Sequence, residues 1–230
     1  MTARELILAR HGEARCNLAG TMTGPSCTGL TDNGRAQTER LGKRLHAETA
    51  YHGPLEAVYA STTRRALQTA HLLTGFLGVE VHEESYLRVP DAGPHAEGKP
   101  WPELRRTEPR DPVNPDRPLA PGGEGWVSYL TRAHAALTRI LDGHTGRVLI
   151  VGHTETLKAA YSLFLGHDDL HRMKFDFDHT ALTIWRPASE WPGAAPTHQR
   201  WTLVCHNDTT HVPHNAPRHT LQTATACNDR

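Results

Sequence analysis

The chain has 230 residues, enough for one large domain or two small ones with a substantial core. Lys and Arg together number 25 and so do Asp and Glu, so no overall charge draws the chain to nucleic acid or to a membrane surface. Hydrophobic residues make up 37% of the chain, and 19 Gly and 16 Pro indicate many loops. Any anion site must therefore be built locally, from cationic side chains that the fold brings together.

The cysteines and the first residues indicate a cytoplasmic protein. No CxxC pair and no zinc-ligand spacing occurs among Cys16, Cys27, Cys205 and Cys227. No long apolar stretch of the kind found in a signal peptide or a membrane span opens the chain. We therefore expect free thiols in a reducing cytoplasm.

The first 87 residues predict strands that alternate with helices. Short apolar runs predict strands over residues 6–9, 55–60 and 79–82. Apolar residues at helical spacing predict helices over residues 32–49 and 66–77. Ser61-Thr62-Thr63 supplies hydroxyl groups that can cap the second of these helices, and Gly78 marks its end.

A Pro- and Gly-rich segment over residues 88–123 comes next. Nine prolines and four glycines stand among its 36 residues, and no periodic element fits it well. Long segments of this kind inside a compact domain are more often functional than filler. We therefore interpret residues 88–123 as an insertion that faces the substrate.

The rest of the chain returns to alternating elements. Helices are predicted over residues 124–141 and 154–165, the second of them ended by Gly166. Val148-Leu149-Ile150-Val151 is wholly apolar, which is typical of a strand buried on both faces. Two late strands are predicted over residues 181–185 and 201–204.

This order of elements favours an α/β fold in three layers. A mostly parallel central sheet is expected to have helices on both faces. We predict one domain over residues 1–215, and a flexible tail over residues 216–230, where the chain turns polar.

Cationic and proton-carrying side chains follow three of the predicted strands. The first strand ends at Arg10-His11-Gly12, the second leads into Ser61 to Arg65, and the strand over 148–151 ends at Gly152-His153-Thr154. Ligands of open α/β sheets bind beyond the carboxyl ends of the strands, and helix N-termini attract anions. Arginines can bind oxyanions through two hydrogen bonds. The sequence therefore predicts a pocket for a compact, doubly charged oxyanion such as phosphate.

These segments resemble the motifs of the histidine phosphatase superfamily, which includes the cofactor-dependent phosphoglycerate mutases. Arg10-His11-Gly12-Glu13 is similar to the family's signature after its first strand, and Asn17 falls where the family has a phosphate-contacting Asn. Residues 61–70 resemble its second block, in which the Arg before Ala, here Arg65, contacts phosphate. Thr23-Gly24 with Leu30-Thr31 resembles the family's substrate loop, and Val151-Gly152-His153 resembles the strand that delivers a second His.

The resemblance implies a phosphoglycerate mutase-like fold and a metal-independent phosphatase. Its substrate would be a small phosphorylated metabolite, plausibly a sugar or nucleoside phosphate. His11 would attack phosphorus and become a phosphohistidine, which water then hydrolyses. The side chains implied to hold the phosphate or the substrate are Arg10, Arg65, His153, Asn17, Thr23 and Thr154. Neither a metal nor another cofactor is implied, because the protein supplies the cations, and a homodimer is left open.

The proton donor for the leaving oxygen is the main departure from the family's pattern. Relatives usually carry a Glu shortly after the third strand, where this chain has Val89. Asp91, two residues further in the same loop, is our first candidate for the general acid. Other carboxylates stay open as alternatives, namely Glu83, Glu84, Glu97 and Glu124.

Other departures bear on the reaction type. Cys27 replaces an Asp common in the substrate loop, and Thr154 replaces a Gly common after the second His. The longer substrate-binding block of the mutases is missing. These departures favour a phosphatase over a phosphomutase, and the Val89 substitution leaves a non-catalytic phospho-ligand binding protein as a further alternative.

Three groups outside these motifs have simpler interpretations. Metal-ligand spacing occurs among His206, Asp208, His211 and His214, but a polar loop after the last strand explains them better. Trp185 and Trp201 are expected to pack on the sheet. Arg64 is expected to face solvent or pair with a carboxylate, because neighbours on a helix point in different directions.

Overall fold

The computed structural model describes residues 3–108, 114, 116–167, 175–188 and 200–213. The predicted flexible tail and the predicted end of the domain at residue 215 lie outside these ranges.

A six-stranded sheet in the order β3-β2-β4-β1-β5-β6 forms the centre of the molecule. Four strands run parallel to one another, namely β1 (Glu5–Arg10), β2 (Leu55–Ser61), β3 (Val81–Glu84) and β4 (Arg147–Gly152). The antiparallel pairings come from β5 (Leu182–Pro187) beside β1 and from β6 (Trp201–Asp208) beside β5. The predicted mostly parallel α/β sheet is confirmed.

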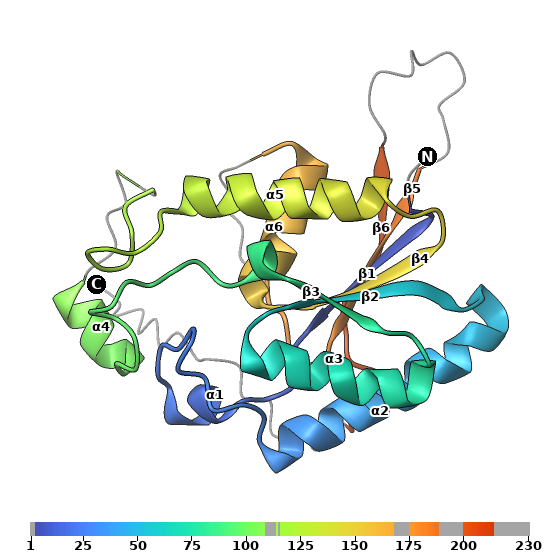
Figure 1. The fold of residues 1–230 in the computed structure, drawn as a ribbon, viewed down its shortest axis with the longest axis horizontal. Helices are drawn as coiled ribbons and strands as arrows, with labels where there is room; N and C mark the ends of the chain where they lie inside the picture. Colours follow the sequence, from blue (N-terminus) through green and yellow to red (C-terminus); the bar gives the residue numbers. More distant parts are fainter. Residues whose placement is uncertain (1–2, 109–113, 115, 168–174, 189–199, 214–230) are drawn as a thin grey trace, which may run out of the picture.

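Helices cover both faces of this sheet (Figure 1). One face carries α2 (Asp32–His52) and α3 (Arg64–Leu77), and the other carries α5 (Trp126–Asp142) and α6 (Thr154–Leu165). Successive side chains of a strand point to opposite faces, so Leu6 and Leu8 pack under α5 and α6 whereas Ile7 packs under α2 and α3. The three-layer prediction is therefore confirmed, and both layers contribute to a core around β1 and β4.

Three short helices were not expected from the sequence. These are α1 (Arg15–Ala19), the 3-10 helix η1 (Ser85–Leu87) and α4 (Trp101–Thr107). The prediction that residues 88–123 hold no periodic element is thus wrong. Pro100 caps α4 and Pro102 lies in its first turn, where a missing N–H costs nothing, and Leu104 anchors the helix in a small apolar cluster.

The ends of two helices show which capping predictions hold. Gly166 ends α6 in the left-handed conformation, at φ 65°, as the sequence indicates. Thr63 stands at the N-cap of α3, but its side chain accepts no capping hydrogen bond, so the predicted hydroxyl cap is wrong. The hydroxyl of Thr63 contacts His153 instead.

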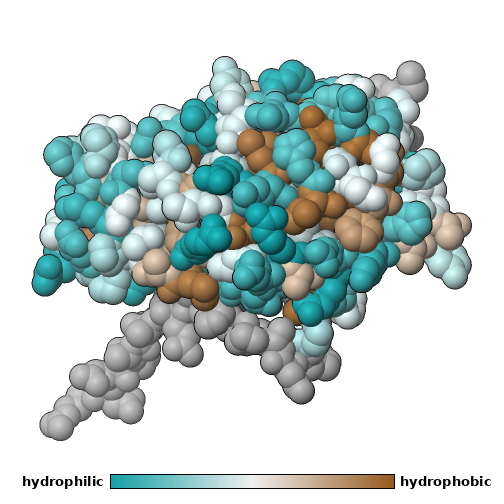
Figure 2. All heavy atoms as spheres, turned by 60° about the horizontal axis from the view of Figure 1, so that its bottom comes forward, coloured by the Kyte–Doolittle hydropathy of each residue, from teal (hydrophilic) through white to brown (hydrophobic). Residues whose placement is uncertain are grey.

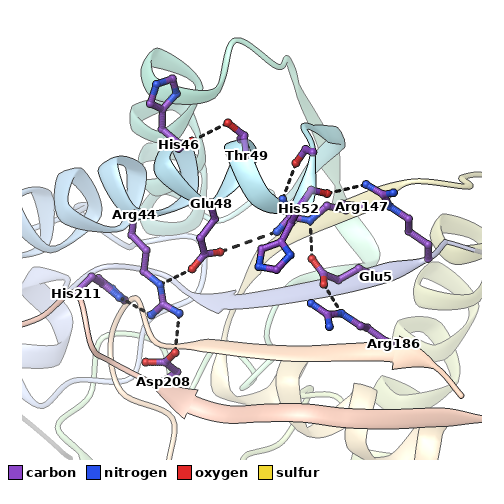
Figure 3. A network of polar contacts seen from close by, with 12 residues as sticks. Glu5, Arg44, His46, Glu48, Thr49, His52, Arg147, Arg186, Asp208 and His211 are labelled. Carbon is purple, nitrogen blue, oxygen red and sulfur yellow. Dashed lines mark hydrogen bonds and ion pairs between the residues drawn. The ribbon is translucent and has the colours of Figure 1, made fainter.

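A network of charged residues lies at the amino ends of β1 and β4 (Figure 3). Glu5 and Arg147 are paired across the two strands, and Oε1 of Glu5 lies 2.6 Å from Nε of Arg147. The other carboxylate oxygen lies 2.6 Å from Nε of Arg186. Glu5 is 3% exposed and Arg147 is 2% exposed, so this ion pair belongs to the interior.

The surface shown in Figure 2 carries hydrophobic side chains interrupted by hydrophilic ones. Two exposed large hydrophobic residues, Leu203 and Val204, are neighbours on the edge strand β6. Among the helices that the structure describes, none is long and apolar enough to cross a membrane.

Candidate active site

The site lies at the carboxyl ends of the central strands β1, β4 and β2. β1 ends at Arg10, and the backbone N–H of His11 donates to the carbonyl of Gly152 at 2.9 Å, which places His11 beside the end of β4. The next residue after β4 is His153, and its ring centroid lies 5.1 Å from that of His11. Arg65 comes from the first turn of α3, directly after β2. Strands far apart in the sequence thus deliver four predicted site residues to one place.

His11 is buried and held in one tautomer. Its Nδ1 lies 2.7 Å from the carbonyl oxygen of Gly12, which can only accept, so Nδ1 carries the proton. Nε2 therefore keeps its lone pair and accepts a hydrogen bond from Nε of Arg65 at 3.0 Å. Burial, followed by the positive charge of Arg65, lowers the pKa of His11 well below its ordinary value. A neutral imidazole with an available Nε2 is what a nucleophile requires.

His153 is the second buried imidazole of the site. Its Nε2 lies 2.9 Å from Oγ of Ser61 and 3.0 Å from Oγ1 of Thr63, which explains why these hydroxyls do not cap α3. Burial, followed by the charges of Arg65 and Arg10, lowers the pKa of His153 well below its ordinary value. Its Nδ1 is buried and has no hydrogen-bond partner among the described residues. A buried nitrogen in this state is suited to bind a ligand oxygen.

The two arginines are fixed by backbone carbonyls. Nη1 of Arg10 donates to the carbonyl of Phe177 at 2.6 Å, and Nη1 of Arg65 donates to the carbonyl of Thr23 at 3.1 Å. Nε of Arg10 is buried without a partner in the described part of the chain. Burial lowers the pKa of Arg10 to about 10, which leaves it charged at neutral pH. Two guanidinium groups without an ion-paired carboxylate among the described residues form an anion site.

The other predicted substrate-contacting residues make contacts of different kinds around this centre. Oδ1 of Asn17, in α1, accepts a hydrogen bond from the backbone of Ala14 at 3.0 Å and lies 3.2 Å from Nε2 of His179. Thr23 takes part through its carbonyl group, which Arg65 contacts. Thr154 is the first residue of α6, next to His153, and is half-buried.

His179 is a site residue that the sequence reasoning missed. It is 7% exposed, and its ring centroid lies 5.7 Å from that of His11. The backbone N–H of Thr180 donates to the carbonyl of Arg10 at 3.0 Å, and Thr180 has φ 60°, a strained value for a β-branched residue. The sequence predicts a strand near residue 182, but it does not show that this strand runs antiparallel beside β1, which is what brings His179 to the site.

The structure brings none of the predicted acid candidates into hydrogen-bond contact with the two site histidines, as far as its described residues show. Asp91 is exposed, and its Oδ1 accepts from the N–H of Gly93 at 2.9 Å. The remaining carboxylates are held or exposed elsewhere: Glu124 by Arg132, Glu84 by Arg139, Glu97 by Ser26 and Gly24, and Glu83 on the exposed side of β3. The identity of the general acid is taken up below.

Residues 97–100, within the 88–123 segment, pack against the predicted substrate loop. The backbone of Met22 exchanges hydrogen bonds with Gly98 and Lys99, at 2.7 and 2.9 Å, and Thr21 forms an isolated bridge with Pro100. Burial raises the pKa of Glu97, but hydrogen bonds from Ser26 and Gly24, followed by the charge of Arg65, hold it below its ordinary value. The insertion therefore shapes the loop that Arg65 contacts.

Cys27 lies at the position where the family resemblance implies an Asp. It is buried against Cys16 and Ala14. A hydrogen bond from Cys16 holds the pKa of the Cys27 thiol below its ordinary value; burial opposes this effect and the charge of Arg65 reinforces it. The charge of Arg65 therefore acts on this thiol.

The polar residues after β6 make separate contacts. His206 lies 2.7 Å from the hydroxyl of Tyr161, and Asp208 pairs with Arg44 at 2.6 Å. His211 lies 3.2 Å from Oγ1 of Thr180, and His214 lies outside the described residues. Within the described part of the chain, no three such side chains are grouped as metal ligands would be. Trp185 is buried in the core and Arg64 is exposed, as predicted.

A buried, neutral imidazole with its lone pair beside two guanidinium groups defines a site for phosphoryl transfer. The chain belongs to the histidine phosphatase superfamily, because the sequence model of its branch 1 matches residues 6–209. The sheet and its helices have the phosphoglycerate mutase-like arrangement that the sequence resemblance implies. The chain is a phosphatase of this superfamily.

Relatives and solved structures agree with membership of this superfamily. A metal-independent phosphoserine phosphatase of Arabidopsis thaliana is 33% identical over 165 residues, which cover 68% of this chain and 67% of that protein. A 2,3-bisphosphoglycerate-dependent phosphoglycerate mutase of Bradyrhizobium diazoefficiens is 28% identical over 178 residues, or 69% of this chain and 80% of the mutase. The structure of Bacillus stearothermophilus YhfR matches with a TM-score of 0.74 and 29% identity over 91% of this chain and 99% of that chain.

Proposed function

We propose that this chain is a metal-independent phosphatase that hydrolyses a small phosphorylated metabolite, such as a sugar or nucleoside phosphate, through a phosphohistidine on His11. The state of His11 carries the proposal. Its Nδ1 proton is committed to the carbonyl of Gly12, and its Nε2 lone pair points at the guanidinium of Arg65. The lowered pKa keeps this lone pair available at neutral pH.

In the first step, Nε2 of His11 attacks phosphorus in line while the bond to the leaving oxygen breaks. Arg65 donates to Nε2 in the free enzyme, so the same N–H is placed to hold a phosphate oxygen once the substrate arrives. Nε of Arg10 and Nδ1 of His153 are buried without partners among the described residues, and we assign them to other phosphate oxygens. Water then hydrolyses the phosphohistidine and releases phosphate.

The charges in the pocket support the proposed independence from metals. Many phosphoryl-transfer enzymes use Mg²⁺ to neutralise the charge that develops on the phosphate oxygens. Here Arg10 and Arg65 can supply that charge, because both lie next to His11 and neither is ion-paired in the part of the chain that the structure describes. The name of the Arabidopsis relative, a metal-independent phosphoserine phosphatase, supports the same conclusion.

A small, polar substrate is supported by the neutral overall charge and by the insertion. The chain carries no net charge that would select a large polyanion. The substrate loop around Thr23 is tied to residues 97–100, so the insertion has the position to select among small phosphate esters.

The direct test is hydrolysis of p-nitrophenyl phosphate in the presence of EDTA. Turnover is expected to persist in EDTA and to vanish in His11→Ala. Loss of turnover in EDTA that added Mg²⁺ or Zn²⁺ restores would overturn the metal-free mechanism.

The similarity to the Bradyrhizobium enzyme supports a phosphomutase as the alternative function. A mutase transfers the phosphoryl group to a second hydroxyl, so it would isomerise a phosphorylated substrate and release little phosphate. Measuring free phosphate and isomer from the same panel of phosphorylated metabolites separates the two activities. We expect stoichiometric phosphate release.

A further inference from the structure

The loop where relatives carry their acid is bound into the structure by its backbone. The carbonyl of Val89 accepts from Nη2 of Arg132 at 3.1 Å, and the carbonyl of Arg88 accepts from Nη1 of the same guanidinium. Glu124 holds Arg132 through contacts of 2.7 Å from each carboxylate oxygen and also accepts from the N–H of Asp91. Glu124 and Asp91 thus serve to fix this loop, and Val89 supplies no proton.

The first turn of α6 lies directly against this loop. Oγ1 of Thr156 contacts the carbonyl of Leu87 at 3.2 Å, and the backbone N–H of His153 donates to the same hydroxyl at 3.1 Å. The helix η1 packs on the α5 side of the sheet, and the chain after it leads away to α4 (Figure 1). Between His153 and Thr156, in this turn, stands Glu155, which is half-buried.

Glu155 is also an acidic neighbour of the phosphate clamp. Burial lowers the pKa of Arg10, and the negative charge of Glu155 opposes this more than that of any other side chain. Burial raises the pKa of the Tyr129 hydroxyl, and the charge of Glu155 raises it further. The charge of Glu155 therefore acts on both Arg10 and Tyr129. Among the described residues it forms no ion pair, unlike Glu84 and Glu124.

Asp178 is the other carboxylate that acts on Arg10. Its Oδ2 accepts a hydrogen bond from Nδ2 of Asn207 at 3.2 Å, and it precedes β5, on the side of β1 away from β4. Glu155 instead shares the first turn of α6 with His153 and with Thr156, whose hydroxyl contacts the carbonyl of Leu87, two residues before Val89. Position and lack of a partner both favour Glu155.

We propose that Glu155 is the general acid of the phosphatase reaction, which replaces the carboxylate missing at Val89. This inference rests on the proposed phosphohistidine mechanism. As the bond between Nε2 of His11 and phosphorus forms, the bond from phosphorus to the leaving oxygen breaks. The Glu155 carboxylate takes up a proton when the bound phosphate supplies the counter-charge of Arg10; this proton then moves to the leaving oxygen, and the alcohol departs. The resulting carboxylate takes a proton from the water that attacks the phosphohistidine.

Substrates whose leaving groups differ in basicity test this role. A nitrophenolate leaves without a proton, whereas an alkoxide needs one. Glu155→Gln should therefore lower kcat/KM by about 10²–10⁴-fold for an alkyl phosphate, but only a few-fold for p-nitrophenyl phosphate. Glu155→Asp should recover part of the loss. Asp32→Asn, which removes an exposed acidic residue from the first turn of α2, is the matched control and should change neither substrate.

The outcomes separate the acid from the phosphohistidine. Phosphohistidine should still form from p-nitrophenyl phosphate in Glu155→Gln. If no phosphohistidine forms in the wild-type protein, the proposed function fails, whatever the role of Glu155. An equal loss for both substrates in Glu155→Gln, or no loss, would overturn the assignment. So would a loss confined to alkyl phosphates in Asp91→Asn or Asp178→Asn rather than in Glu155→Gln. Melting temperatures of all variants show whether each one is folded.

Discussion

The two ends of the β1–β4 ladder carry similar side chains with opposite arrangements. At the amino ends, Glu5 faces Arg147 across the strands and also binds Arg186, so a buried carboxylate pairs with one buried and one partly exposed cation (Figure 3). At the carboxyl ends, Arg10 pairs in register with Gly152 and leads into His11, and its Nε has no partner among the described residues.

The paired charges at the amino ends serve the stability of the fold, whereas the groups at the carboxyl ends that lack partners among the described residues serve the binding of a ligand. A buried cation that lacks a counter-charge is costly, so it persists where a ligand supplies the charge. The pKa of Glu5 shows the satisfied case: burial raises it, but Arg147 and Arg186 together hold it below its ordinary value. At the other end, burial and the neighbouring positive charges lower the pKa of His11 and His153. This surplus of positive charge suits a pocket that binds a dianion.

The largest expected effect is at the carboxyl end. His11→Ala should lower kcat by about 10⁴-fold or more, because it removes the nucleophile. Steady-state hydrolysis of p-nitrophenyl phosphate measures the loss, with circular dichroism to verify the fold. Retention of more than a tenth of the activity would mean that another group attacks phosphorus.

At the amino end, the effect should fall on stability. Glu5→Gln should lower the free energy of unfolding by about 3–5 kcal/mol, because two arginines then lose their buried counter-charge. Urea denaturation measures this, and kcat per folded molecule should not change. Glu48→Gln is the control: Glu48 lies 4.0 Å from Arg147 and is partly exposed, so its loss should cost less than about 1 kcal/mol. Equal losses of unfolding free energy in Glu5→Gln and Glu48→Gln would refute the claim that the buried Glu5 ion pair stabilises the fold more than an exposed one.

Arg65→Lys should lower kcat by about 10²–10³-fold, because a lysine cannot reproduce the Nε contact to His11. The neighbouring exposed arginine offers a matched control, since Arg64→Lys keeps the same charge on the same helix turn. We expect Arg64→Lys to stay within about twofold of wild type. Similar losses in both variants would show that net charge, rather than geometry, governs the rate.

A smaller effect should appear as pH falls. The pKa values of His11 and His153 are lowered in the folded state, so below pH 6.5 the unfolded chain takes up protons that the folded chain does not. Stability is therefore fully present above pH 6.5 and falls by about 1.4 kcal/mol per histidine per pH unit below it. The free energy of unfolding, measured by denaturation, should differ less between pH 7.5 and pH 5.5 in His153→Asn than in the wild type. An unchanged difference would contradict the assigned pKa shift.

The sequence could predict most of the sheet and much of the site, for a physical reason. Parallel strands meet at their carboxyl ends, so residues that follow β1, β2 and β4 had to converge, and His11, Arg65 and His153 do. The apolar runs and the end of α6 at Gly166 depend on local patterns, which a sequence displays.

What the sequence could not predict depends on contacts between distant segments. Asp91 lies two residues after Val89, yet its backbone N–H donates to Glu124 and its carboxylate accepts from the N–H of Gly93. Helix α4 begins within a proline-rich segment because its Leu104 finds an apolar cluster. His179 reaches the site only because β5 runs antiparallel beside β1.

The most direct test of the central claim is capture of the phosphorylated enzyme. A single turnover with p-nitrophenyl phosphate, quenched in denaturant at alkaline pH where phosphohistidine is stable, can be mapped by mass spectrometry. We predict one phosphoryl group on His11, absent from His11→Ala. Turnover without a phosphorylated residue, or with the phosphoryl group on a different side chain, would contradict the account.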